Sequence, residues 1–130
     1  MGLFLFCYAN LYAQKEGPSK RLTVFIDCNG VSCDENYIHT EINIVDFLAE
    51  RAGADVDILI TAAPTGGRTD QYQLIFYGQN NFKTHLDTLR FTTETNATKD
   101  EMRIQLVHFI KLGLVPLLSK TPTLLHFQFK

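Results

Sequence analysis

Apolar and polar side chains alternate over several short runs of the chain, and this two-residue period predicts β-strands. The runs are rich in β-branched, aromatic and leucine residues and are separated by Gly, Pro, Asn and Asp, which favour turns. Strands are predicted at residues 21–27, 55–63, 71–78, 87–93 and 123–130.

Two other segments have the spacing of an amphipathic helix. In residues 36–52 the apolar positions are Ile38, Ile42, Val45, Leu48, Ala49 and Ala52. The second helix is predicted to begin at the capping box Thr98-Lys99-Asp100-Glu101, and its apolar face carries Met102, Leu106, Phe109 and Ile110. We expect Gly113 to interrupt this helix, and Pro116 cannot sit comfortably in its interior.

The elements follow one another as β-α-β-β-β-α, and the last segment is predicted to start a further strand. This order predicts an α+β fold in which two helices pack on a mixed, mostly antiparallel sheet. The first two strands are expected to be parallel through a right-handed crossover, and the hairpin after them to be antiparallel. Residues 21–122 form the predicted single domain, and residues 123–130 resemble a strand that is cut off.

The first 13 residues, MGLFLFCYANLYA, contain no charge and consist mainly of apolar residues. Such a run ending in a small residue is typical of a signal peptide with cleavage after Ala13, although a basic beginning is missing and Leu11 is large for its position. Residues 14–20 would then be a polar linker. The alternative is that residues 1–13 form a buried strand or helix of the domain.

Cleavage at that point would remove Cys7 and leave Cys28 and Cys33 as an even pair. The residues between them, Asn29-Gly30-Val31-Ser32, favour a turn that brings the sulfur atoms together. In an oxidising compartment the pair would form a small-ring disulfide. Two free thiols, or redox or metal chemistry, remain as alternatives, although the spacing is neither that of a thiol oxidoreductase nor of a complete zinc site.

Charge and hydropathy exclude some classes of protein. The 130 residues contain 12 Lys and Arg against 14 Asp and Glu, a net charge of −2. This balance argues against a nucleic-acid-binding protein, which normally carries a basic surface. No segment reaches the roughly 20 apolar residues that a transmembrane helix needs.

No catalytic, metal-binding or cofactor-binding motif is present. The histidines are scattered without ligand spacing, and Gly66-Gly67 lacks the following Lys-Ser or Lys-Thr of a phosphate-binding loop, so a hairpin turn is predicted there. The most clustered acids are Asp27, Asp34 and Glu35. If they converged, they would form a cation site or an acid/base pair. Otherwise they form an acidic helix start beside a solvated loop.

The order and spacing of several short motifs resemble an uncharacterised family of Gram-negative envelope proteins. The matching segments are Cys28…Cys33-Asp34, Tyr37-Ile38, Thr40-Glu41-Ile42, Val45-Asp46-Phe47, Ala54-Asp55-Val56, Leu59-Ile60-Thr61, Thr65-Gly66-Gly67, Asp87-Thr88-Leu89 and Leu112-Gly113-Leu114-Val115. The resemblance implies an exported domain at the periplasm or the periplasmic face of the outer membrane, preceding an outer-membrane β-barrel in the same polypeptide. It implies no catalytic residue.

The favoured interpretation is therefore a non-catalytic periplasmic domain that binds a ligand or an envelope partner, including a barrel in cis. Its expected binding surface comprises Asp27, Asp34, Glu35, Thr65, Gly66, Gly67 and Arg68. The alternative is a periplasmic hydrolase that uses the acids around the Cys28–Cys33 loop. Geometry discriminates the two, because a hydrolase needs those carboxylates to converge beside a pocket.

Overall fold

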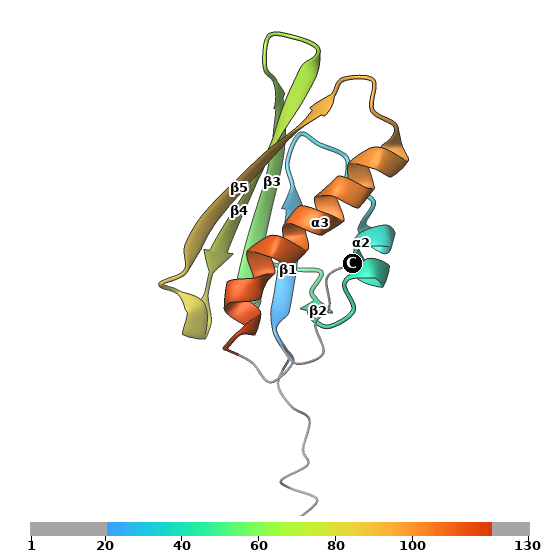
Figure 1. Ribbon diagram of the computed structural model, residues 1–130. Helices are drawn as coiled ribbons and strands as arrows, with labels where there is room; N and C mark the ends of the chain where they lie inside the picture. Colours follow the sequence, from blue (N-terminus) through green and yellow to red (C-terminus); the bar gives the residue numbers. More distant parts are fainter. Residues whose placement is uncertain (1–20, 121–130) are drawn as a thin grey trace, which may run out of the picture.

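The computed structural model describes residues 21–120, which fold as a five-stranded mixed sheet with two α-helices (Figure 1). The elements are β1 (Thr23–Cys28), α2 (Glu35–Glu41), β2 (Asp46–Phe47), β3 (Val56–Pro64), β4 (Thr69–Gly78), the 3-10 turn η1 (Asn80–Phe82), β5 (Leu86–Glu94) and α3 (Lys99–Leu118). The predicted signal peptide, linker and last strand, at residues 1–13, 14–20 and 123–130, lie outside the described residues.

The strands lie in the order β2-β1-β3-β4-β5. β1 is parallel to both β2 and β3, whereas β3, β4 and β5 form an antiparallel meander. The α+β class and the predicted order of elements are confirmed. The parallel pairing of the first two predicted strands and the antiparallel hairpin after them are confirmed as well.

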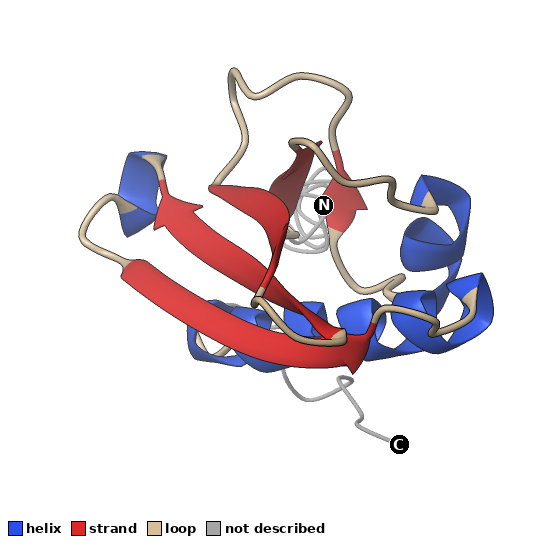
Figure 2. Ribbon diagram, turned by 90° about the horizontal axis from the view of Figure 1, so that it is seen from above, coloured by secondary structure: helices blue, strands red, loops and turns tan. Residues whose placement is uncertain are grey.

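One face of the sheet forms the core with α3. Alternate strand residues on this face are fully buried, and they meet the buried positions of the helix: Val24, Ile58, Ile60, Leu74 and Phe76 on the strands, and Ile110, Leu114 and Leu117 on α3. Figure 2 shows the long helix running along this face of the sheet. Burial of these side chains is the main stabilising contribution, at roughly 1.5–3 kcal/mol for each fully buried large apolar side chain.

The helix predicted over residues 36–52 is wrong beyond its first two turns, because α2 ends at Glu41. The chain then extends and adds β2 to the edge of β1, where the Asp46 and Leu48 amides donate to carbonyls of β1 or of the residue before it, at 2.9 and 2.8 Å. The β-branched residues Ile42, Ile44 and Val45 around Asn43 favour an extended chain over a helix. The unpaired edge of β1 supplies the hydrogen-bond partners that this extension needs.

The predicted interruption at Gly113 is also wrong, since α3 continues through Gly113 and Pro116 to Leu118. Gly113 lies against the ring of Phe76, and a β-carbon at that position would come within 2.0 Å of Cζ of the ring. The glycine therefore allows the helix to approach the sheet closely rather than ending it. The predicted capping box is confirmed, because Thr98 and Glu101 each bond the other's backbone amide.

We expect Gly113→Ala to destabilise the fold by about 1–3 kcal/mol, because the overlap with Phe76 outweighs the higher helix propensity of alanine. Gly67→Ala is the matched control, since a β-carbon there meets no atom within 4 Å. Urea unfolding followed by circular dichroism measures both variants. A Gly113→Ala protein as stable as the parent would contradict the close contact.

Candidate functional site

Three connections gather at one end of the molecule, as Figure 1 shows. β1 and β3 are parallel, so the loop after β1 and the β3–β4 hairpin leave the sheet at the same end. The connection from β5 to α3 arrives there too, and the amide of Thr95 donates to the carbonyl of Arg68 in the hairpin at 2.8 Å. The structure thereby brings Asp34 and Glu35 to the same end as residues 65–68.

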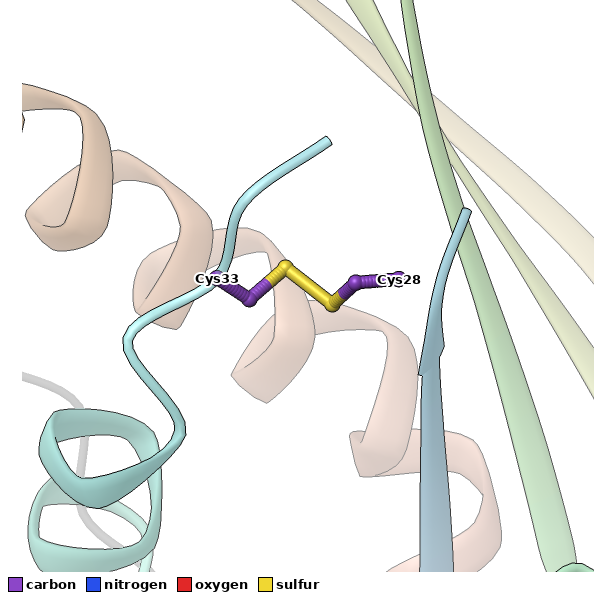
Figure 3. Close-up of a disulfide and its surroundings, with 2 residues drawn as sticks. All are labelled: Cys28 and Cys33. Atoms are coloured by element: carbon purple, nitrogen blue, oxygen red, sulfur yellow. A yellow bond between two sulfur atoms is a disulfide. The ribbon is translucent and has the colours of Figure 1, made fainter. Parts of the chain in front are cut away.

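The Cys28–Cys33 disulfide is present, as predicted, with 6.4 Å between the α-carbons. Figure 3 shows the bridge joining the end of β1 to the segment that leads into α2. The amide of Asn29 also donates to the carbonyl of Ile60 on β3 at 3.0 Å, and Gly30 takes a positive φ of 73°. A ring of this size stabilises the fold by roughly 2 kcal/mol on the chain-entropy model.

A cleft of about 540 Å³ lies between this loop and the first turns of α3. Its lining residues come from three parts of the chain: Val31, Ser32, Cys33 and Asp34 from the loop, Tyr72 from β4, and Lys99, Met102, Arg103 and Leu106 from α3. Of the predicted binding surface only Asp34 lines the cleft. Thr65, Gly66, Gly67 and Arg68 form an exposed hairpin turn that does not line the cleft, in which Gly66 has a φ of 88° and the amide of Thr65 donates to the carbonyl of Thr69.

Arg103 ties the loop to α3 at the rim of the cleft. Its guanidinium donates to Asp34 at 2.9 Å and to Asp100 at 2.7 Å, and it lies over the ring of Tyr37 at 4.3 Å. Asp34 also caps α2 by accepting from the amide of Tyr37 at 3.1 Å. That backbone hydrogen bond and the bond from Arg103 lower the pKa of Asp34.

Tyr72 lines the cleft from β4. The residue is 4% exposed, and its ring stacks on Phe91, which stacks in turn on Phe109 of α3. Its hydroxyl donates to the sulfur of Met102 at 3.7 Å. Burial, with a smaller contribution from Asp70, raises the pKa of Tyr72, so the phenol keeps its proton at neutral pH.

Asp27 and Asp34 do not converge, so the condition for a cation site or an acid/base pair is not met. Asp27 lies on the opposite face of the sheet, where Arg51 bonds both Asp27 and Asp57 at 2.7 Å. Asp57 is 8% exposed, and this burial raises its pKa against the opposing effect of Arg51. Within residues 21–120, no group of three His, Cys, Asp or Glu side chains is placed to hold a metal ion.

No sequence motif marks Tyr72, Lys99, Met102, Arg103 or Leu106 as site residues. Tyr72 occupies an inward position of a strand and Leu106 the apolar face of a helix, so both patterns indicate only a core. Arg103 carried a weak signal, since it is an arginine close to the capping box. Its pairing with Asp34, 69 residues away, depends on how α3 crosses the sheet.

Comparisons with known proteins leave the family open. No family model matches the chain, and no curated protein matches it. A solved structure that is similar to it is the solution NMR structure of an uncharacterized lipoprotein B from Nitrosomonas europaea, 10% identical over 86% of this chain and 92% of that chain, with a TM-score of 0.37. A similarity this weak carries no argument about function. Neither α-helix of the described part of the chain is both long and apolar enough to cross a membrane.

Replacing Asp34 and Asp57 by asparagine should change stability in opposite directions at neutral pH. Asp34, with its lowered pKa, contributes stability above the usual carboxyl pKa of about 4 and loses it as the pH falls through the lowered value. Asp57, with its raised pKa, favours the folded state when protonated, and that contribution is lost as the pH rises through the raised value.

At about pH 7 we therefore expect Asp34→Asn to unfold at lower urea concentration than the parent, and Asp57→Asn at higher concentration. Asparagine caps helices as well as aspartate does, so the first variant isolates the charge. The difference in stability between each variant and the parent should shrink as the pH falls toward about 3, where the carboxyl groups of the parent become protonated. If both variants unfolded at a lower urea concentration than the parent, or both at a higher one, the causes given for the two pKa shifts would be contradicted.

Proposed function

We propose that this chain is an exported, non-catalytic binding domain of the Gram-negative envelope and that the cleft is its binding site. The observation that carries the proposal is the construction of the cleft. One wall is a loop closed by the Cys28–Cys33 disulfide, and the other wall is the first part of a 20-residue helix packed on the sheet. The two walls are tied together by the ion pair of Asp34 with Arg103.

Such a site is prepared for binding before its ligand arrives. The disulfide and the ion pair restrict the loop in the free protein, so binding need not supply the entropy cost of ordering it. A volume of about 540 Å³ lies within the range of small-molecule sites, and an apolar lining with a few polar groups is typical of them. The separate ion pairs of Asp27 and Asp34 speak against the hydrolase alternative.

Export is supported by the disulfide, because such bonds persist in oxidising compartments. The apolar residues 1–13 have the pattern of a signal peptide. The resemblance to envelope proteins adds a working position for the domain, beside an outer-membrane barrel in the same polypeptide. In that arrangement the loop end, with the cleft and the hairpin at residues 65–68, is the surface that faces a ligand or partner.

Mass spectrometry after alkylation of thiols in intact Gram-negative cells tests the compartment. We expect the mature chain to begin after Ala13 and to carry no alkylated cysteine, and to gain two alkyl groups only after reduction. The reason is that cleavage removes Cys7 and oxidation joins the remaining pair. Recovery of a chain that keeps residues 1–13 and has Cys28 and Cys33 alkylated would contradict export.

Binding in the cleft is tested by two-dimensional NMR of the isotope-labelled chain with a library of chemically diverse small fragments. We expect the bound fragments to shift amides of Ser32, Asp34 and Arg103, since these residues line the cleft. The amides of Tyr77 and Leu86, which pair at the other end of β4 and β5, serve as internal controls. A screen in which no fragment shifts the cleft amides would overturn the proposed function.

A further inference from the structure

The deeper part of the cleft is apolar. Met102 and Leu106 lie one helical turn apart on α3 and face Val31 and the Cys28–Cys33 disulfide across the cleft. Leu106 is buried, and Met102, Val31 and Cys33 are partly buried against the core. A ligand that fills this part must therefore bring an apolar body, because burying a polar group there without a partner is costly.

The hydroxyl of Tyr72 lacks a strong acceptor. Only 4% of the residue is exposed. Within residues 21–120, however, its hydroxyl forms a hydrogen bond only with the thioether sulfur of Met102, at 3.7 Å. A thioether is a weak acceptor, and buried tyrosine hydroxyls normally find a better one. Tyr72 lines the cleft, so a ligand oxygen placed near its hydroxyl would complete the hydrogen bonding of that group.

The charges at the rim leave one ammonium group available. Both oxygens of Asp34 are occupied, one by the amide of Tyr37 and the other by Arg103. Arg103 is shared between Asp34 and Asp100. Lys99, in contrast, forms no ion pair with any residue in the described range 21–120, although it lines the cleft. The cleft thus offers a buried O–H donor and a cation but no free carboxylate of its own.

We propose that the cleft binds a small amphipathic carboxylate, with its apolar body against Met102 and Leu106 and its carboxylate on Tyr72 and Lys99. This inference rests on the proposed function and specifies the ligand class of the same site. A carboxylate oxygen is a strong acceptor for a phenol, and its charge complements the ammonium of Lys99. The apolar body displaces water from the inner lining.

Four probes of matched structure test the ligand class in NMR titrations of the oxidised chain. Decanoate combines a long alkyl chain with the carboxylate. Decanol keeps the chain without the charge, and decyltrimethylammonium keeps the chain with the opposite charge. Butyrate keeps the carboxylate on a shorter chain. We expect decanoate to shift the amides of Ser32 and Arg103 and to bind about tenfold more tightly than decanol or decyltrimethylammonium. Butyrate should bind more weakly still, since most of the apolar burial is lost.

Two variants with matched controls test the contact residues. Tyr72→Phe removes only the hydroxyl, and Lys99→Gln replaces the ammonium by an uncharged amide on a shorter side chain. Each should weaken decanoate binding by about five- to tenfold, and Lys99→Gln should leave decanol binding unchanged because decanol carries no charge. The controls are Tyr77→Phe, a partly exposed tyrosine on the opposite face of the sheet, and Lys111→Gln, three turns further along α3. Neither control should alter decanoate binding.

The possible results separate this inference from the proposed function. Equal affinity for decanoate and decanol, or decanoate binding that both variants leave unchanged, would overturn the carboxylate assignment. Diverse fragments that shift the cleft amides when decanoate does not would overturn it too, while the binding function would stand. A cleft that takes neither fragments nor decanoate would overturn both.

Discussion

The contact between Gly113 and Phe76 sets the position of α3, and the rest of the structure depends on that position. Because the glycine has no side chain, the helix lies directly on the aromatic ring of β4. Arg103 lies ten residues earlier on the same rigid helix, about 15 Å along its axis. The packing in the middle of the sheet therefore decides where the first turns of α3 stand, and with them one wall of the cleft.

The opposite wall is positioned by different means. A loop of polar and small residues has little apolar surface with which to fold itself, so its shape depends on covalent and hydrogen-bonded anchors. The Cys28–Cys33 bond and the bond from Asn29 to Ile60 hold it to the sheet, and Asp34 joins it to α3 through Arg103. Two walls that are each held to the sheet and joined to each other by Asp34 and Arg103 restrict the cleft before any ligand binds, which suits the proposed binding role.

Two arginines organise the acidic residues on opposite faces of the sheet. Arg51 holds Asp27 and Asp57, and Arg103 holds Asp34 and Asp100. Each guanidinium offers several donors in a fixed plane, so it can satisfy two carboxylates at once. The arrangement separates Asp27 from Asp34, although they lie only seven residues apart in the chain, because alternate residues of β1 point to opposite faces and the loop then turns toward α3.

Local patterns in the sequence determined much of this protein. The spacing of Cys28 and Cys33, the capping box at Thr98 and the alternation in β3 and β4 predict features that the structure contains, because each depends on a few neighbouring residues. The pattern at Ile38, Ile42 and Val45 predicted a long helix, yet those residues are buried on a short helix and the extended segment after it. Apolar spacing indicates which residues are buried but not which neighbours bury them. Tertiary structure alone decided that Gly113 is a contact point rather than a helix end, and that Tyr72, Lys99 and Arg103 meet at one cleft, because those contacts join residues that are distant along the chain.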